Sequence, residues 1–506
     1  MAEIELKLDV DRGARALLLR AAALAGAKPR RMRMASLYFD TPDCALAGAG
    51  MALRLRRSGR RWAQCLKAGR SGTGGLHARD EWEFERPGPV LDLSLFADTP
   101  LAALDGAASL HRTLAKAFTI EFQRTAWQLE PAAGCRLEVA LDCGFVESRG
   151  RREEISEVEI ECIAGDPAHA FGLARHLLDE VALRPSATAK AARGYRLFNR
   201  SPLRPVKASP ARLDEAMGPL PAARALVAAA LDHLQANEEG VLRAAAPEFV
   251  HQARVALRRM RSAFRMFHAA IGDERANAWR AEWSEATRAL GAARDWDVFA
   301  TESLPALAAA CGDHSVSRTL MRRAALHRRR CREDARAALR APRYARAVLD
   351  LASWLAGIGE ETVDGAAEPL AGFASRWIRK RHRSLLAGLA GLAGIPAEER
   401  HRVRIDAKRL RYGVEGLASI FPAGKERRYT RRLADLQDAL GRANDAATGA
   451  RLLAELAPPE AFAAFARGWL AARMVPDPAL IASLAARLEK SPRFWHRKGA
   501  SHPPHV

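Results

Sequence analysis

The sequence predicts a multidomain protein, with an α+β N-terminal part built on an eight-stranded antiparallel β-barrel and an all-helical C-terminal part. The length of 506 residues exceeds what a single hydrophobic core usually holds. Apolar residues recur with a period of two through residues 1–200 and with a helical period after the proline-rich segment 201–212. We therefore expect a domain at 1–200, a linker at 201–212 and a helical domain at 213–495.

Alternation of apolar and polar residues defines the expected strands of the first domain. Turn-forming residues separate them, and helical stretches are expected near 12–25 and 168–181. The eight strands are expected at 4–10, 36–41, 52–58, 61–67, 77–84, 119–129, 135–144 and 153–162. Eight strands suffice to close a small barrel, which leaves no unpaired sheet edge.

Most of these strands carry charged residues on one face. The default interpretation of an antiparallel sheet is that this face lies in water. In the last strand, however, Glu157, Glu159 and Glu161 stand in a row and would repel one another there. Carboxylates at this spacing supply oxygen ligands for Mg²⁺ or Mn²⁺, and Arg and Lys on neighbouring strands would hold phosphates. The pattern favours an enclosed site for a multiply charged anion and its divalent cations.

The charged residues occur in a set that resembles the CYTH domain family, also called triphosphate tunnel metalloenzymes. The opening Glu3-x-Glu5-x-Lys7 is similar to the family's ExExK signature. It is followed, in the family's order, by Tyr38-Phe39-Asp40-Thr41, Arg54-x-Arg56, Lys67, Arg79-x-Glu81-x-Glu83, Arg124, Glu138 with Asp142-x-Gly144, Glu157-x-Glu159-x-Glu161, and Lys190 with Arg193-Gly194-Tyr195. One departure is Ala189, where the family often has serine before the lysine.

The resemblance implies metal-dependent hydrolysis of a phosphoanhydride in a tunnel, with Mg²⁺ or Mn²⁺ as the cofactor. It implies catalytic roles for Lys7, Glu3 and Glu5. The implied metal ligands are Glu3, Glu5, Glu138, Asp142, Glu157, Glu159 and Glu161, and the implied substrate-binding residues are Arg54, Arg56, Lys67, Arg79, Arg124 and Lys190. Family members also act on thiamine triphosphate or ATP. Inorganic triphosphate is the leading substrate because Trp62 and Trp82, by their alternation, are expected to face outward.

Positive charge is concentrated in the second part of the chain. The net charge is +21, of which residues 1–200 supply +4 (30 basic, 26 acidic) and residues 201–506 supply +17 (50 basic, 33 acidic). A field of this sign favours a polyanionic partner. Charge alone does not separate nucleic acid, inorganic polyphosphate and an anionic membrane surface.

An internal repeat places the positive charge on two equivalent helices. HQARVALRRMR at 251–261 matches HRVRIDAKRLR at 401–411 with an offset of 150, and the offset recurs where 289–295 matches 439–445. Two bundles, at about 213–350 and 351–495, are therefore expected. Helical spacing puts His251, Arg254, Arg258 and Arg261 on one face, and His401, Arg404, Lys408 and Arg411 on the equivalent face. Nearby aspartates are expected to neutralise these faces only in part.

These basic faces resemble the CHAD family, conserved-histidine α-helical domains, over about 213–490. Arg294-Asp295-x-Asp297 and Leu436-Gln437-Asp438-x-Leu440-Gly441 are similar to further motifs of that family. The resemblance implies two four-helix bundles that meet at a basic groove and bind inorganic polyphosphate. Nucleic acid is the competing ligand, but it would need base-stacking aromatic residues, and those near the faces, Phe264, Phe267 and Tyr412, are expected in the core. A polyphosphate-binding scaffold without catalysis is the alternative to an enzyme.

The remaining features concern location. No uncharged apolar stretch reaches the roughly 18 residues that a membrane helix needs, and the first residues show no export pattern. Seven cysteines without a CxxC pair are expected to be reduced. The sequence therefore predicts a cytoplasmic protein without a membrane partner, with polyphosphate granules as a candidate location.

Overall fold

The computed structural model describes residues 2–69, 73–104, 110, 112–358, 368–390, 397–422, 424–474 and 477–495. Its contacts divide the chain into two compact units, each described here by itself. The described part of the N-terminal unit comprises 2–204 and 339–358, and that of the helical unit comprises 205–338 and 368–495.

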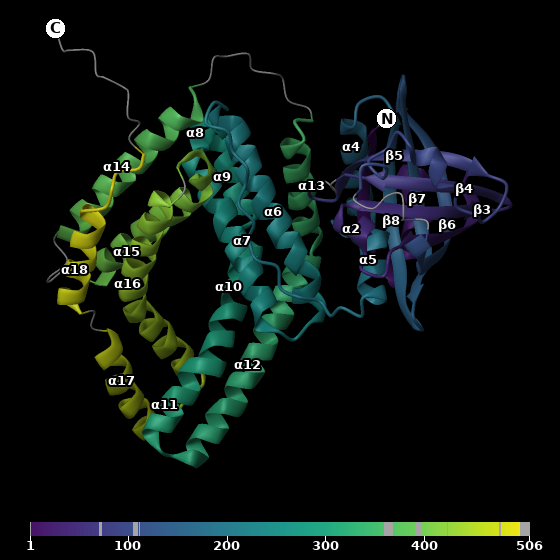
Figure 1. The fold of residues 1–506 in the computed structure, drawn as a ribbon. Helices are drawn as coiled ribbons and strands as arrows, with labels where there is room; N and C mark the ends of the chain where they lie inside the picture. Colours follow the sequence, from purple (N-terminus) through teal and green to yellow (C-terminus); the bar gives the residue numbers. More distant parts are fainter. Residues whose placement is uncertain are drawn as a thin grey trace, which may run out of the picture. The chain divides into compact units, whose positions relative to one another are not determined.

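A single antiparallel sheet of nine strands forms the N-terminal unit (Figure 1). The strands are β1 (Ala2–Val10), β2 (Arg30–Asp40), β3 (Met51–Ser58), β4 (Arg61–Ala68), β5 (Leu76–Arg86), β6 (Ala115–Ala132), β7 (Cys135–Ser148), β8 (Arg151–Ala164) and β9 (Leu183–Pro185). Their order is β5-β4-β3-β2-β6-β7-β8-β1-β9, and β1 also pairs with β5. The sheet therefore curls until β1 is bonded on both sides, by β5 and by β8. The short β9, which the sequence did not predict, pairs with β1.

Apolar side chains cover the outer face of the curled sheet. The strands place Leu8, Leu137 and Ile160 in one buried cluster with Phe171 and Leu177 of α4 (Ala168–Glu180). Because successive side chains on a strand point to opposite faces, the charged residues between them turn to the concave side. In β3, for example, Leu53 and Leu55 are buried on one face while Arg54 points to the other.

The remaining elements of this unit are short. They are η1 (Arg12–Ala14), α1 (Arg15–Leu18), η2 (Ala22–Leu24), α2 (Ala45–Gly48), η3 (Leu93–Phe96) and α5 (Lys190–Phe198). The single helix predicted at 12–25 is broken because Ala21 is extended, at φ −57° and ψ 133°. This break allows Leu18 and Leu24 to enter the same core.

One helix from the middle of the chain belongs to the N-terminal unit. Helix α13 (Pro342–Leu355) packs against α4 and β9, with Leu349 fully buried in the core that α4 covers. Arg175 Nε donates to Asp350 Oδ1 at 2.6 Å across this contact. The sequence alone places this segment in the helical part. Its periodicity predicts an amphipathic helix but does not indicate the surface against which the helix packs.

The helical unit contains no strand among its described residues, which confirms the prediction of an all-helical second part. Its longer elements are α6 (Pro219–Arg243), α7 (Pro247–Met266), α10 (Ser284–Val298), α12 (His314–Arg340), α14 (Leu370–Ala390), α15 (Ala397–Gly416) and α16 (Lys425–Glu455). Its shorter elements are α8 (His268–Ile271), α9 (Asp273–Glu282), the π-helix η4 (Phe299–Ser303), α11 (Leu304–Cys311), η5 (Ala418–Ile420), α17 (Glu460–Met474) and α18 (Pro478–Glu489).

The segment predicted as a linker is held by side-chain hydrogen bonds. The amide of Asn237, on α6, pairs with the backbone of Val206 in both directions, at 3.0 Å and 2.9 Å. Asn237 is fully buried. Residues around 206 are therefore fixed to the helical unit although proline excludes them from a helix or sheet.

Two further predictions concern the cysteines and the membrane. All seven cysteines are free, as expected. No helix in the described part of the chain is long and apolar enough to cross a bilayer.

Candidate active site and basic helix faces

A cavity of about 120 Å³ lies on the concave side of the curled sheet. It collects side chains from β1, β3, β4, β6, β8 and α5. The residues predicted from the sequence that line it are Glu5, Lys7, Arg54, Arg56, Lys67, Arg124, Glu159, Glu161 and Lys190. Six cations and three carboxylates thus face one small space.

Strand pairing brings the ExExK residues opposite the last strand. The register of β1 and β8 places Lys7 across from Glu159 and Glu5 across from Glu161. Lys7 Nζ lies 2.7 Å from Glu159 Oε1 and 3.0 Å from Glu5 Oε1. A motif at residues 3–7 and another at 157–161 therefore form one charge network.

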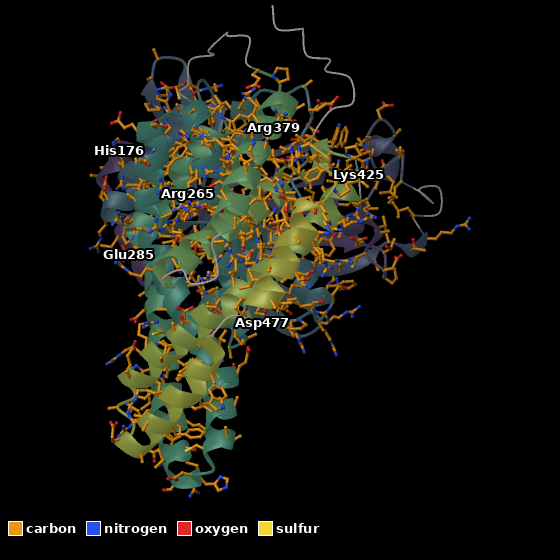
Figure 2. The ribbon with its side chains drawn as sticks, turned by 90° about the vertical axis from the view of Figure 1, so that its left-hand side faces the viewer. His176, Arg265, Glu285, Arg379, Lys425 and Asp477 are labelled. Atoms are coloured by element: carbon orange, nitrogen blue, oxygen red, sulfur yellow. The ribbon has the colours of Figure 1, made fainter. Side chains whose placement is uncertain are left out.

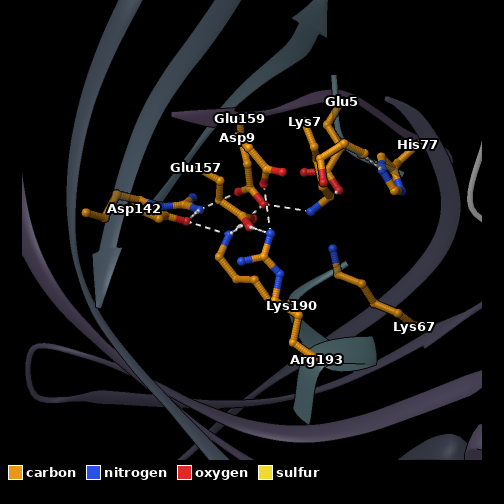
Figure 3. A network of polar contacts seen from close by, with 12 residues as sticks. Glu5, Lys7, Asp9, Lys67, His77, Asp142, Glu157, Glu159, Lys190 and Arg193 are labelled. Carbon is orange, nitrogen blue, oxygen red and sulfur yellow. Dashed lines mark hydrogen bonds and ion pairs between the residues drawn. The ribbon is translucent and has the colours of Figure 1, made fainter. Parts of the chain in front are cut away.

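Lys190, at the start of α5, neutralises the most buried carboxylates (Figure 3). Its Nζ lies 2.7 Å from Asp142, 2.6 Å from Glu157 and 2.8 Å from Glu159. Asp142 is fully buried and Glu157 is 1% exposed. Within the same helix, a Cβ at Gly194 would lie 2.2 Å from the ring of Phe118, so only glycine lets α5 approach this closely.

Arg124, on β6, joins the same network from the other side. Its guanidinium forms a bidentate pair with Asp142 at 2.8 Å and 2.7 Å, and its Nη2 donates to Glu159 at 2.5 Å. Glu138 lies farther away, at 3.8 Å. The bidentate geometry fixes the plane of the guanidinium beside the cavity.

A second wall of the cavity pairs cations of β3 and β4 with carboxylates of β5. Arg54 and Lys67 both contact Glu81, at 3.2 Å and 3.1 Å, and Arg56 pairs with Glu83. These are the cations that the family resemblance assigns to phosphate binding. A phosphate that binds these cations would replace the carboxylates of Glu81 and Glu83 as their anionic partner.

The surroundings of Lys7, Lys190 and Glu159 favour the ionised form of each group. Burial lowers the pKa of Lys7, but Glu159 and Glu5 outweigh it and hold that pKa above its ordinary value. The pKa of Lys190 is raised in the same way by Asp142, Glu157 and Glu159. Burial raises the pKa of Glu159, but Lys190, Lys7 and Arg124 outweigh it and hold it well below its ordinary range. The carboxylate therefore remains an oxygen donor across the neutral pH range.

The donor set of the cavity fits a hard divalent cation. Glu5, Glu159 and Glu161 offer carboxylate oxygens, the ligands that Mg²⁺ and Mn²⁺ prefer. The carboxylates of Glu5 and Glu159 form ion pairs with the Lys7 ammonium group. A metal ion that bound these oxygens would replace those ion pairs. Among the described residues, Cys65, Glu81 and Glu83 form another group of possible ligand atoms within 4.8 Å of one another, outside the cavity lining.

Other predicted residues lie outside the cavity lining. Asp142 and Glu157 sit behind Lys190 and Arg124, and Glu138 lies beside Arg124. The side chains of Glu3 and Arg79 lie outside the described residues. Neither Trp62 nor Trp82 is part of the lining.

Sequence reasoning missed several contributors to the site. Tyr38 and Phe122 line the cavity, and Lys190 lies 5.3 Å from the ring of Phe122. Asp9 extends the network by accepting from Arg193 at 2.8 Å. The alternation in β2 and β6 carried the signal for the two aromatic residues, because it places them on the charged face.

In the helical unit, parts of the two predicted basic faces meet. Arg254 and Arg258 of α7 lie close enough to Arg404 and Lys408 of α15 to act on their ionisation. The guanidinium of Arg258 stacks 4.8 Å over the ring of Tyr412. Burial, then Arg258, Arg404 and Arg254, lowers the pKa of Lys408 to about 7. Asp445 opposes this repulsion at Arg404 and Lys408, but the net effect still lowers both pKa values, which is typical of an anion-binding surface.

Three predicted members stand apart from this junction. His401 is exposed, and Arg261 interacts with Arg280 of α9 instead. His251 is partly buried, and burial followed by Arg294 lowers its pKa, so the ring is neutral at pH 7.

The expected neutralisation by aspartates is partial. Arg254 pairs with Asp295 at 3.2 Å. Asp297 is buried and binds Arg328 and Arg332 of α12, at 2.6 Å and 2.9 Å. One of the two aspartates in the Arg294-Asp295-x-Asp297 sequence thus stabilises the helix bundle and not the basic face.

Comparison with known proteins identifies both parts of the chain. Residues 1–195 match the CYTH domain and residues 225–454 match the CHAD domain. An inorganic triphosphatase of Haemophilus influenzae is 30% identical over 165 residues, which covers 32% of this chain and 46% of that protein. The chain thus spans about half the length of this curated relative.

A solved structure supports the second assignment. The crystal structure of the CHAD domain from the plant Ricinus communis aligns with a TM-score of 0.50 and 32% identity, covering 56% of this chain and 96% of that one. The chain therefore carries an N-terminal CYTH domain and a C-terminal CHAD domain.

Proposed function

We propose that the N-terminal domain hydrolyses inorganic triphosphate to diphosphate and phosphate with Mg²⁺ or Mn²⁺, and that the helical domain binds inorganic polyphosphate. The observation that carries the first part is the 120 Å³ cavity faced by six cations and three carboxylates. Pockets for organic ligands usually measure about 300–1,000 Å³. A space this small and this charged favours a compact polyanion over a nucleotide or thiamine triphosphate.

Each wall has its own proposed task. Arg54, Arg56 and Lys67 bind phosphate oxygens, and Arg79 is assigned the same role by its place in the motif. Lys190 and Arg124 hold Glu159 and its buried neighbours and also line the cavity that would receive the substrate. A bound metal would polarise phosphoryl oxygens and activate water. Most of the catalysis in such a site comes from positioning and electrostatic stabilisation.

The carboxylates have graded roles in this proposal. Glu5, Glu159 and Glu161 line the cavity and are the proposed direct metal ligands, together with Glu3. Asp142, Glu157 and Glu138 support the cations that surround the cavity. Lys7 bridges Glu5 and Glu159, so it positions both proposed ligands and adds positive charge for the transferred phosphoryl group.

A hydrolysis panel tests the proposed activity. Phosphate release from tripolyphosphate should require Mg²⁺ or Mn²⁺ and stop with a chelator, and should exceed release from ATP and thiamine triphosphate. Glu5→Gln keeps the shape of the side chain and removes a charged metal ligand, so kcat should fall about 100-fold. Exposed Glu154→Gln is the matched control and should leave kcat unchanged. Absence of release by the wild type would leave only the scaffold function.

The junction of the basic faces supports the proposal for polyphosphate. Arg254, Arg258, Arg404, Lys408 and Arg411 gather on α7 and α15 with few carboxylates among them. A repeating phosphate chain matches a surface of this kind because it needs charge without base-stacking groups. Nucleic acid is the weaker candidate for this surface, since Tyr412 is already stacked under Arg258.

Lys408 should make polyphosphate binding depend on pH. Its pKa of about 7 means that it is mostly neutral at pH 8, and a bound anion favours its charged form. Binding at pH 8 should therefore take up protons, and affinity should fall as the pH rises above 7. Titration calorimetry in two buffers of different ionisation enthalpy measures this uptake. In Lys408→Arg the uptake should vanish and affinity should vary less with pH; equal uptake in both proteins would contradict the assignment.

A further inference from the structure

A second cavity, of about 400 Å³, lies inside the helical domain. It is formed by α7, α8, α9, α14 and α15, and its size falls within the range of small-molecule pockets. Arg265 lies in its wall among the packed helices (Figure 2). Arg280, Arg381 and Arg409 complete a set of four guanidinium groups.

These guanidinium groups are poorly neutralised. Burial, then Arg280 and Arg409, lowers the pKa of Arg265 to about 10. Among the described residues, no carboxylate pairs with Arg265, Arg280 or Arg381, and Arg409 has one 3.2 Å contact, with Asp406. The carboxylate in the lining, Asp273, is exposed and pairs with His268 at 2.5 Å. The four groups are partly buried, and like charges gathered in such a space repel one another unless an anion joins them. The cavity is therefore suited to a ligand with one or more phosphate groups.

The other walls are unsuited to a purely inorganic ligand. The indole of Trp377 and the thioether of Met266 line the same space. Gly413 makes room for the indole, because a Cβ there would lie 2.3 Å from two ring atoms. The guanidinium of Arg381 stands 5.8 Å from the indole centroid. An aromatic surface flanked by a guanidinium is a typical platform for a planar base.

The internal repeat distinguishes the residues of this cavity from those of the polyphosphate surface. At the offset of 150, the counterparts of Arg265, Arg280 and Trp377 are Glu415, Thr430 and Val227. These three residues therefore have no basic or aromatic counterpart at the repeat offset, although Arg409 matches Arg259, whereas the basic faces recur in both halves. A site present once points to a ligand other than the repeating chain.

We propose that the cavity built by Arg265, Arg280, Arg409 and Trp377 binds a free nucleotide, with the base on the indole and the phosphates on the guanidinium groups. Asn277 supports this arrangement by accepting from Arg280 Nη1 at 3.0 Å, which orients that guanidinium. The inference goes beyond the triphosphatase proposal and does not depend on it.

Binding to the full-length protein tests this inference with three ligands: ATP, tripolyphosphate and a short single-stranded RNA. Trp377→Leu should weaken ATP binding about tenfold, since stacking contributes on the order of 1–3 kcal/mol per base. The same variant should leave tripolyphosphate affinity within about twofold. Trp377→Phe keeps an aromatic face and should recover most of the ATP affinity that Trp377→Leu loses. This recovery would show that the fold is intact. Arg265→Met should weaken ATP binding without changing tripolyphosphate hydrolysis.

Photocrosslinking locates the nucleotide. An azido-ATP probe should label peptides of α14 or α15, and labelling should fall in Trp377→Leu. Labelling confined to the N-terminal domain, or unchanged ATP affinity in both variants, would overturn the proposal. Equal losses of ATP and tripolyphosphate in Trp377→Leu would exclude base stacking, and RNA binding without ATP binding would replace the free nucleotide by a nucleic acid.

Discussion

Replacing Lys190 with methionine should destabilise the N-terminal domain by about 3–5 kcal/mol, because removal of one partner leaves buried charge uncompensated. The Lys190 ammonium contacts three carboxylates within 2.8 Å, and two of them, Asp142 and Glu157, are at most 1% exposed. After the substitution Asp142 retains its pair with Arg124, but Glu157 keeps only a longer contact of 3.7 Å with Arg193. Urea unfolding, followed by hydrogen exchange of β7 and β8 amides, measures the loss.

The pH dependence distinguishes this mechanism from a packing defect. The raised pKa of Lys190 means that its stabilising charge is fully present below its ordinary value of about 10.5 and is lost only at higher pH. In the variant, buried carboxylates can be neutralised by protonation. The difference in the free energy of unfolding between the wild type and the variant should therefore become smaller as the pH falls toward 4. The control is Arg346→Met, which removes an exposed pair with Asp179 and should cost about 1 kcal/mol or less. A gap that stays constant with pH would indicate lost packing only.

Removing α13 should prevent the N-terminal domain from folding stably. A fragment that ends at residue 204 keeps every strand but exposes the apolar surface of α4 and β9 that α13 covers. Leu349 is fully buried in that contact, so Leu349→Ala alone should cost about 2–5 kcal/mol. Leu326, on α12, is 68% exposed and provides the matched control, with an expected effect within about 0.5 kcal/mol for Leu326→Ala.

Addition of the missing helix tests the same contact from the other side. A peptide of residues 339–358 should bind the 2–204 fragment and raise its resistance to proteolysis, and the Leu349→Asp peptide should not. A fragment that is equally stable with and without the peptide would show that α13 is dispensable for this domain.

The sequence predicted the strands of the N-terminal domain well because their alternation reflects a physical constraint. In a sheet with one apolar and one charged face, the charged residues all point to the same side. The sequence alone therefore placed Lys7, Arg56 and Glu159 on one face. The extent of burial could not be read in this way. Asp142 and Glu157 share the charged face, but α5 closes over them, and nothing in their own strands indicates that cover.

The helical features depended more on tertiary structure. The repeat identified Arg254 and Arg404 as equivalent, but whether a basic residue meets its counterpart or another helix is decided by packing, as Arg261 beside Arg280 shows. The same limit applies to Trp377 and Arg265, which come from separate helices without a spacing motif. Helical periodicity predicts which face of α13 is buried, but it does not predict the surface against which that face packs.

The place of α13 in the chain affects how the protein is made. The ribosome completes every strand of the first domain by residue 185, yet the helix that seals it ends at Leu355, 151 residues after the end of the N-terminal segment at 204. At about 5–20 residues per second, this separation corresponds to roughly 8–30 s of translation. During that interval the nascent chain presents an uncovered apolar surface. Chaperone association should therefore peak after the first domain has emerged and end once α13 leaves the exit tunnel.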